Sequence, residues 1–226
     1  MQIDDCDIDV GTRSIRAELY APDAPGPHAG VVLMHELFGL SSHVRADARS
    51  LARAGYLVVA PDLYSGSGAR YCIKMMFSRA SIENRADFGP TAEVGRILDW
   101  LKARPDCNGK LGMIGMCLTG GFVLQMARRD DLSAPVVFHH SFGQRGGGMP
   151  PADAADVKHT VLGHFAEHDA RFCPLERVAK LERDMQGKLD KHVYPGVGHG
   201  LRSMFRHTPQ GEQSWQRTLQ FFREHL

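Results

Sequence analysis

The sequence predicts an α/β protein with a mostly parallel, doubly wound sheet and helices flanking both faces. The first observation is a set of short, continuous apolar runs such as AGVVLM at 29–34, which is typical of strands buried on both faces. The second is that helix-like amphipathic segments alternate with these runs, which favours a parallel sheet. The 226 residues, of which 43% are hydrophobic, are enough for a single domain over 1–226.

Strand and helix patterns alternate through the first half of the chain. In order, the predicted elements are a strand over 14–20, a strand over 29–34, a helix over 44–52, a strand over 56–60 and a helix over 94–101. Gly55 is expected to end the first helix, as glycine often does. Residues 64–90 show no clear period, although the Met-rich stretch at 71–80 is compatible with a short helix.

The same alternation continues in the second half. In order, the predicted elements are a turn at 105–109, a strand over 110–114, a helix over 118–126, a strand over 135–138, a strand over 160–165, a helix over 175–185, a strand over 191–194 and a helix over 215–222. The Gly- and Pro-rich stretch at 143–152 is predicted to be a loop and not a domain linker, because the alternation resumes after it.

Charge and cysteine usage exclude several classes of protein. Lys and Arg total 27 against 26 for Asp and Glu, so no excess charge favours nucleic acid or an anionic membrane surface as a partner. The sequence has no apolar run long enough to span a membrane, and its acidic start is unlike a secretory signal. The five cysteines are scattered and odd in number, which favours reduced thiols and a cytoplasmic location.

The stretch GMCLTGG at 115–121 carries the main chemical signal. It lies between the strand-like 110–114 and a helix-like segment, which is the setting of the nucleophile elbow G-x-S-x-G in the α/β-hydrolase fold. Here Cys117 occupies the nucleophile position, and Thr119 occupies the position of the second glycine. A cysteine among glycines is often a small core residue, but this context predicts a nucleophile.

A cysteine nucleophile needs a base and a group that orients the base. In α/β-hydrolases the acid and then the histidine follow the nucleophile along the chain. Asp169 follows the strand predicted at 160–165, and His199 follows the strand predicted at 191–194. We therefore predict the set Cys117, Asp169 and His199, while a helix-capping Asp169 and a surface His199 are the structural alternatives.

An acyl-transfer site also needs donors for the oxyanion. The backbone N–H of Leu118 is one predicted donor, because it follows the nucleophile, and that of Leu37, in the loop after the strand at 29–34, is the other. His139 and His140 end a predicted strand near this site. They are expected to be polar strand-end residues with satisfied hydrogen bonds.

Four blocks of the sequence resemble the dienelactone hydrolase family in the right order, from about Ala29 to the C-terminus. The four blocks are VVLMHELFGLSSHVRADARSLARAGYLVVAPDLY, GMCLTGG, EHDARFCP and YPGVGHG. The resemblance implies a cysteine-dependent hydrolase that opens a lactone or cleaves a related ester and needs no cofactor or metal. It also implies that Cys117, Asp169 and His199 act together, and that Glu36 lies close to the thiol.

The resemblance also concerns the substrate. It implies a small lactone or ester, with anionic substrates preferred, bound through arginines of which Arg79, Arg85 and Arg202 are the candidates by region. The family's elbow has a glycine where this chain has Thr119, and this difference predicts a slightly different approach of the following helix. The sequence leaves open whether the chain is a monomer or a homodimer.

Two alternatives of other classes remain. His164, Glu167 and His168 form H-x-x-E-H, which in some metallopeptidases binds zinc from one helix. Here the residues before the motif favour a strand, which argues against that site. The other alternative is a non-catalytic ligand-binding or thiol-sensing protein on the same scaffold, which would need an exposed cysteine but no downstream Asp and His.

Overall fold

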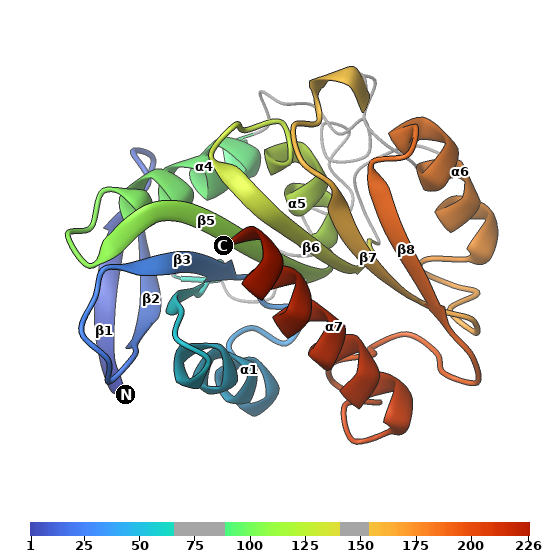
Figure 1. Cartoon of the computed structure of the whole chain (residues 1–226), viewed down its shortest axis with the longest axis horizontal. Helices are drawn as coiled ribbons and strands as arrows, with labels where there is room; N and C mark the ends of the chain where they lie inside the picture. Colours follow the sequence, from blue (N-terminus) through green and yellow to red (C-terminus); the bar gives the residue numbers. More distant parts are fainter. Residues whose placement is uncertain (66–88, 141–153) are drawn as a thin grey trace.

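A twisted sheet runs through the centre of the chain (Figure 1), whose computed structural model describes residues 1–65, 89–140 and 154–226. Within these residues the sheet has eight strands in the order β1-β2-β4-β3-β5-β6-β7-β8. The strands are β1 Gln2–Asp9, β2 Ser14–Ala21, β3 His28–Leu33, β4 Leu57–Pro61, β5 Cys107–Cys117, β6 Leu132–His140, β7 Val161–Ala166 and β8 Leu189–Tyr194. This strand order places β5, the strand that ends at Cys117, between β3 and β6.

The sheet is mostly parallel, as the sequence predicts. Strand β2 pairs antiparallel with β1 and with β4, and all pairs from β4 to β8 are parallel. In the centre, Val32 of β3 lies opposite Val59 of β4 on one side and Met113 of β5 on the other. Apolar side chains fill these central positions because helices cover both faces.

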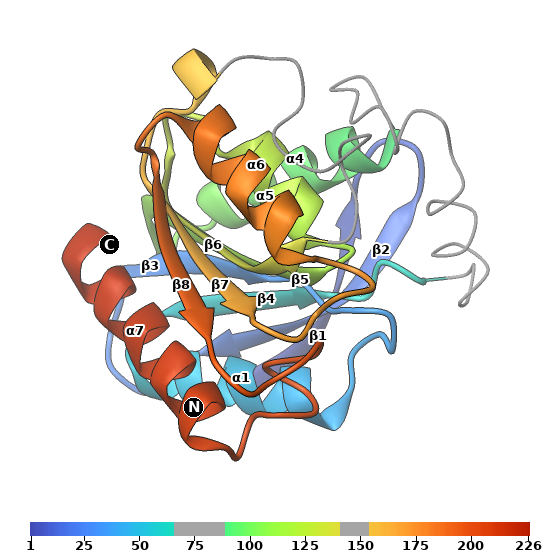
Figure 2. The same cartoon turned by 90° about the vertical axis from the view of Figure 1, so that its right-hand side faces the viewer.

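Helices cover the two faces of the sheet (Figures 1 and 2), which confirms the doubly wound arrangement. One face carries α1 Ser42–Arg53 and α7 Pro209–His225, and the other carries α4 Gly89–Lys102, α5 Gly120–Met126 and α6 Leu175–Met185. Two separate apolar clusters correspond to these two layers. Leu51 and Phe222 belong to the cluster under α1 and α7, whereas Ile97, Phe122 and Leu181 belong to the cluster under α4, α5 and α6.

Strand β1 is the main element that the sequence patterns do not predict. Its sequence, QIDDCDID, is rich in aspartate, which is rare in strands, and most of its side chains are exposed. It is held by pairing with β2 over its whole length, from Gln2 opposite Ala21 to Asp9 opposite Ser14. Its position at the edge of the sheet therefore tolerates charges that a central strand could not bury.

Smaller differences concern element ends. Strand β5 begins at Cys107, inside the turn predicted at 105–109. The Met-rich stretch at 71–80 and the Gly- and Pro-rich loop at 143–152 lie outside the described residues.

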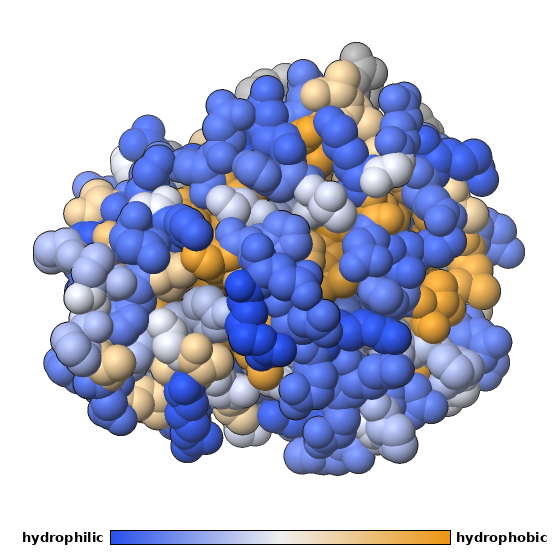
Figure 3. Space-filling view, in the orientation of Figure 1, coloured by the Kyte–Doolittle hydropathy of each residue, from blue (hydrophilic) through white to orange (hydrophobic). Residues whose placement is uncertain are grey.

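Hydrophilic side chains dominate the face shown in Figure 3, where apolar ones form small separate areas. No helix within the described ranges is both long and apolar enough to cross a lipid bilayer.

Candidate active site

Cys117 lies at a sharp turn between β5 and α5. It is the last residue of β5, and its φ of 57° lies in the left-handed region that residues other than glycine rarely adopt. The chain then turns, with the Thr119 N–H donating to the Met116 carbonyl at 3.1 Å, and α5 begins at Gly120. A strained residue between a strand and a helix is the geometry of a nucleophile elbow. It places Cys117 at the carboxyl end of a central parallel strand.

Two glycines allow the strand and the helix of this turn to approach closely. A Cβ atom at Gly115 would lie 2.4 Å from the Thr119 carbonyl oxygen and 2.6 Å from a methyl group of Val123. A Cβ atom at Gly120 would lie 2.5 Å from the His139 carbonyl oxygen. All three distances are shorter than those that real Cβ atoms show, so the elbow needs glycine at positions 115 and 120.

Thr119, which replaces a glycine of the family pattern, has a defined role in the turn. It is fully buried, and its hydroxyl accepts a hydrogen bond from the Met116 N–H at 2.8 Å and donates one to the Met116 carbonyl at 3.0 Å. The side chain thus satisfies polar backbone groups at the end of β5. A hydroxyl at this position stabilises the turn instead of disturbing it.

Replacing Thr119 with valine is expected to lower the free energy of unfolding by about 1–3 kcal/mol, because the buried Met116 N–H would lose this acceptor. Thr119→Ser keeps the hydroxyl and is expected to retain most of the stability. Urea unfolding of the three proteins measures the difference. Equal stability of the valine and serine variants would show that the hydroxyl does not hold the turn.

Asp169 and His199 meet at the same edge of the sheet. Asp169 follows β7 and His199 follows β8, and His199 Nδ1 lies 2.6 Å from Asp169 Oδ2. Asp169 is buried, and its other carboxylate oxygen accepts the Phe172 N–H at 3.1 Å. The His199 side chain is also hydrogen-bonded to Cys117. The structure therefore joins the three side chains that the sequence predicts to act together.

This contact changes the proton affinity of the histidine. Burial by itself lowers the pKa of His199, but hydrogen bonds to Asp169 and Cys117 outweigh it and raise the pKa to about 9. For Asp169, burial raises the pKa, but the hydrogen bond and charge of His199 bring it below the ordinary value of an aspartate. The pair is therefore a carboxylate that stabilises an imidazolium, which makes His199 a stronger base than an isolated histidine.

The loop after β3 is held by two side chains, His35 and Tyr64, that the sequence patterns do not single out. The Leu63 N–H donates to His35 Nε2 at 3.0 Å, so His35 Nδ1 carries the proton and donates to the Glu36 carbonyl at 2.7 Å. The Tyr64 hydroxyl donates to the Leu37 carbonyl at 2.8 Å. The signal for His35 was a histidine directly after a buried apolar strand. Both contacts fix the peptide groups around Leu37.

The loop lies beside the elbow because β3 and β5 are neighbours, with the Met34 N–H donating to the Ile114 carbonyl at 2.9 Å. Glu36 is buried in this loop, at the sheet edge where β5 ends in Cys117. The predicted oxyanion donors are the N–H groups of Leu37 and Leu118. Within residues 1–65, 89–140 and 154–226, neither N–H has a hydrogen-bond acceptor. These two N–H groups remain the predicted oxyanion donors.

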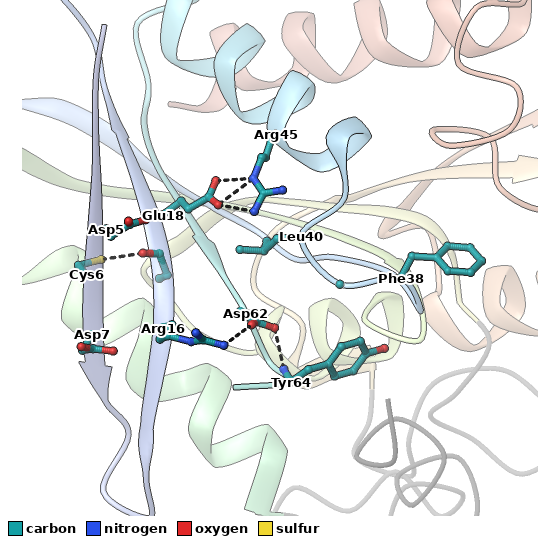
Figure 4. A pocket seen from close by; sticks show the side chains of 12 residues that line it. Asp5, Cys6, Asp7, Arg16, Glu18, Phe38, Leu40, Arg45, Asp62 and Tyr64 are labelled. Carbon is teal, nitrogen blue, oxygen red and sulfur yellow. Dashed lines mark hydrogen bonds and ion pairs between the residues drawn. The ribbon is translucent and has the colours of Figure 1, made fainter. Parts of the chain in front are cut away.

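A cavity of about 690 Å³ lies between β1, β2 and this loop (Figure 4). Neither Cys117, Asp169 nor His199 lines it. Its charged groups largely pair with each other, since Arg45 lies 2.7 Å from Glu18 and Arg16 lies 3.6 Å from Asp62. Asp62 also accepts the Tyr64 N–H at 3.0 Å, so this wall of the cavity supports the loop. The cavity is therefore separate from the group that contains Cys117.

His139 and His140, at the end of β6, differ from expectation. Both are buried, and no described residue is a hydrogen-bond partner for either ring nitrogen of His139 or for His140 Nε2. The prediction that their hydrogen bonds are satisfied within the protein is therefore wrong. Burial lowers the pKa of each to about 3, so both rings are neutral. A polar residue at a strand end usually reaches solvent, so no sequence pattern signals this burial.

The structure gives Arg202 a different position from the one predicted. Its Nε and Nη2 atoms bind the Asp47 carboxylate, and Nη1 donates to the Gly211 carbonyl at 3.0 Å. Its guanidinium lies 4.5 Å from the centre of the Trp215 ring. Arg202 thus links α1 to the start of α7, and its donors are not directed to a substrate carboxylate. Arg79 and Arg85 lie outside the described residues.

The H-x-x-E-H motif does not form one face of a helix. His164 lies in β7, where its ring nitrogens contact the Tyr194 hydroxyl at 2.9 Å and the Thr218 hydroxyl at 3.0 Å. Glu167 accepts the Gly196 N–H at 2.9 Å, and His168 is exposed. The zinc site of this motif requires both histidines to project from one helical turn. The extended backbone of β7 is incompatible with that requirement.

Among the residues that the structure describes, His139, Asp169 and His199 form a group whose potential metal-ligating atoms lie within 4.8 Å of one another. Two of these residues already bind each other through the 2.6 Å contact between Asp169 and His199. A metal ion would have to compete with that hydrogen bond. The donor set therefore fits a hydrogen-bonded acid–base pair better than a metal centre.

Comparisons with known proteins show the family of the chain. The model of the dienelactone hydrolase family matches residues 15–226. A protein of Azospirillum brasilense that is named as a carboxymethylenebutenolidase is 30% identical over 226 residues, covering 94% of each chain. One of Escherichia coli K12 with the same name is 27% identical over 213 residues, covering 88% of this chain and 78% of that protein.

Solved structures show the same fold. A crystal structure titled as a dienelactone hydrolase of Klebsiella pneumoniae has a TM-score of 0.80 at 24% identity and covers all of both chains. A dienelactone hydrolase-like promiscuous phosphotriesterase from metagenomic libraries has a TM-score of 0.80 at 22% identity, covering 99% and 98% of the two chains. These neighbours establish the α/β-hydrolase fold. The match of the family model over residues 15–226 shows that the chain belongs to the dienelactone hydrolase family.

Proposed function

We propose that this protein hydrolyses a lactone or carboxylic ester through Cys117, His199 and Asp169, with a thioester intermediate. The observation that carries the proposal is the chain of contacts from Cys117, at a strained strand–helix turn, to His199 and on to the buried Asp169. A thiol with an adjacent base, and a carboxylate that orients the base, are the parts that nucleophilic acyl transfer requires.

In the first half-reaction, Cys117 Sγ attacks the acyl carbon and its proton passes to His199. The N–H groups of Leu37 and Leu118 stabilise the negative charge that develops on the carbonyl oxygen. Collapse of the tetrahedral intermediate breaks the bond between the acyl carbon and the ring or ester oxygen. That oxygen leaves as an enolate or alkoxide and takes the proton from His199, so that a thioester remains on Cys117.

In the second half-reaction, water attacks the thioester carbonyl and gives a proton to His199. The carbon–sulfur bond breaks, the carboxylic acid is released, and Cys117 regains its proton from His199. Thiolate expulsion from the tetrahedral intermediate competes with forward collapse in the first half-reaction. We therefore expect enol esters, enol lactones and aryl esters, whose leaving groups are already good, to react faster than simple alkyl esters.

The substrate class rests on the relatives. Proteins named as carboxymethylenebutenolidases align over most of this chain, which supports a small unsaturated lactone as substrate. We propose that anionic substrates are preferred over neutral ones, with Arg79 and Arg85 as candidates for the positive charge. Arg202 does not supply this charge, because its donors bind Asp47 and Gly211.

Turnover of a panel of enol lactones, aryl esters and thioesters tests the proposed function. The rate of each carboxylate-bearing compound is compared with the rate of its neutral analogue, at low and at high salt. Mass spectrometry of the acid-quenched enzyme should show an acyl group, and peptide mapping should locate it on Cys117. Hydrolysis with the acyl group on another residue, or no hydrolysis of any compound, would contradict the proposal.

Glu36→Gln tests whether this buried carboxylate lies beside the thiol, as we propose. The substitution keeps the shape and removes a negative charge, so Cys117 should react faster with iodoacetamide at neutral pH. Turnover should fall, because we propose that the carboxylate assists proton transfer from the thiol. Glu18→Gln is a matched control, since Glu18 pairs with Arg45 in the cavity away from Cys117. An unchanged alkylation rate in Glu36→Gln would remove Glu36 from the site.

A further inference from the structure

Two rings contact the ring of His199. His139 lies 4.2 Å away between ring centres, and Phe172 lies 4.5 Å away. His139 ends β6 beside the elbow, since its carbonyl oxygen is the atom that excludes a side chain at Gly120. Its φ of 42° is in the left-handed region, where histidine is more common than most residues. The end of β6 thus holds the His139 ring against the proposed base.

Packing alone does not explain why this residue is a histidine. An apolar ring could contact His199 as Phe172 does, without burying two polar atoms. Both ring nitrogens of His139 are buried, and no described residue is a hydrogen-bond partner for either of them. A buried polar group in this condition costs about 1–3 kcal/mol of stability. A buried polar group in this condition calls for an explanation, and a water molecule or a catalytic role is among those that apply to such groups in proteins.

The distances between these side chains are compatible with one water molecule. A ring nitrogen of His139, a ring nitrogen of His199 and a carboxylate oxygen of Asp169 lie within 4.8 Å of one another. One water molecule can bridge two groups up to about 5.5 Å apart, through two ordinary hydrogen bonds. A water bound to His139 can therefore reach the histidine that accepts its proton.

We propose that His139 holds the water that hydrolyses the thioester, an inference that rests on the proposed function. The unprotonated nitrogen of the neutral His139 ring accepts one hydrogen bond from this water. The water gives its other proton to His199 while its oxygen bonds to the acyl carbon. The carbon–sulfur bond then breaks, and the proton on His199 passes to the Cys117 sulfur, which restores the resting enzyme. His139 neither gains nor loses a proton during these reaction steps.

Two variants separate hydrogen bonding from packing. His139→Phe keeps a ring against His199 but has no hydrogen-bonding atom. His139→Asn keeps a donor and an acceptor and tolerates the left-handed backbone, but loses the ring. Phe172→Leu is the matched control, because it weakens the other ring contact while the Phe172 N–H to Asp169 remains. Melting temperatures show whether each variant is folded.

The assay is stopped-flow hydrolysis of p-nitrophenyl acetate, in which the burst of p-nitrophenol reports thioester formation and the steady rate reports its hydrolysis. In His139→Phe, the burst rate should stay within about threefold of wild type while the steady rate falls by about tenfold or more. The acetylated enzyme should accumulate on Cys117 in the quenched sample. His139→Asn should hydrolyse the thioester faster than His139→Phe, and Phe172→Leu should not accumulate it.

Other results overturn the inference. If the burst and the steady rate fall together in both His139 variants, the residue only supports the position of His199. If His139→Phe turns over at the wild-type rate, it does not hold the water. A wild-type enzyme that hydrolyses the ester with no acyl group on Cys117 would instead refute the proposed function. If either His139→Phe or His139→Asn fails to fold, the burst and steady rates of the other variant, compared with those of the wild type, still test the inference.

Discussion

Replacing Cys117 with alanine is expected to lower kcat/KM for enol-lactone or aryl-ester hydrolysis by about 10⁴-fold or more. Loss of a nucleophile that acts as a unit with its base has an effect of that order. The melting temperature should change little, because Cys117 is only half-buried and alanine removes a single sulfur atom. The oxyanion donors would remain and account for any residual rate.

Cys107→Ala is the matched control for this experiment. Cys107 is the first residue of β5 and Cys117 is the last, so Cys107 lies at the opposite end of that strand, away from the site. The activity of Cys107→Ala per folded molecule should equal that of the wild type. Steady-state kinetics on both variants, after correction for the folded fraction, gives the comparison. Retained turnover in Cys117→Ala would refute the assignment of the nucleophile.

Asp169→Asn is expected to have the second largest effect, a fall in kcat of about 10³–10⁴-fold. The carboxylate accepts from His199 Nδ1 at 2.6 Å, whereas an amide nitrogen in its place donates. His199 would then carry its proton on Nε2, the nitrogen that faces Cys117, and could no longer accept the thiol proton. The Phe172 N–H would keep an acceptor, so the loop should remain in place.

The same variant should change how stability depends on pH. The pKa of His199 is raised to about 9 in the folded protein, above the unfolded value of about 6.5. A group with a raised pKa contributes stability that is fully present below pH 6.5 and is lost as the pH rises to 9. Asp169, whose pKa is lowered, contributes stability that is present above its unfolded pKa and is lost in acid.

Thermal unfolding of wild type and Asp169→Asn between pH 5 and pH 10 measures this effect. The stability advantage of the wild type should be largest near pH 5 to 6.5 and should shrink as the pH approaches 9. Glu167→Gln is a control, because Glu167 follows the same strand but binds the Gly196 N–H and not His199. A wild-type advantage that grows above pH 7 would contradict the raised pKa of His199.

Local sequence patterns predict much of the fold and the candidate site. Central strands such as 29–34 and 56–60 are recognised because burial on both faces makes them continuously apolar. Cys117 is recognised because an elbow is a short segment whose strand, glycines and helix are contiguous. Asp169 and His199 follow from the order of strands, since parallel strands bring their carboxyl ends to one edge.

Other features depend on contacts between distant residues. Strand β1 is stable only because β2 pairs with it, since its own aspartates are poor strand formers. Arg202 is predicted by its region to bind substrate, but Asp47, 155 residues earlier, binds it instead. A single sequence records which residues carry charge. It does not record which partner the fold will bring within hydrogen-bonding distance.

The sequence by itself therefore determined the α/β class, the elbow at Cys117 and the order of the acid and the histidine. Each of these follows from the hydrophobic pattern of strands and helices or from residues that are neighbours along the chain. Only the tertiary structure decided the burial of His139 against His199 and the pairing of Arg202 with Asp47. The physical reason is that burial and hydrogen bonding are properties of the surroundings of a side chain. Those surroundings come from β5, β6, β7, β8 and α1, which are separated along the chain and meet only in the folded protein.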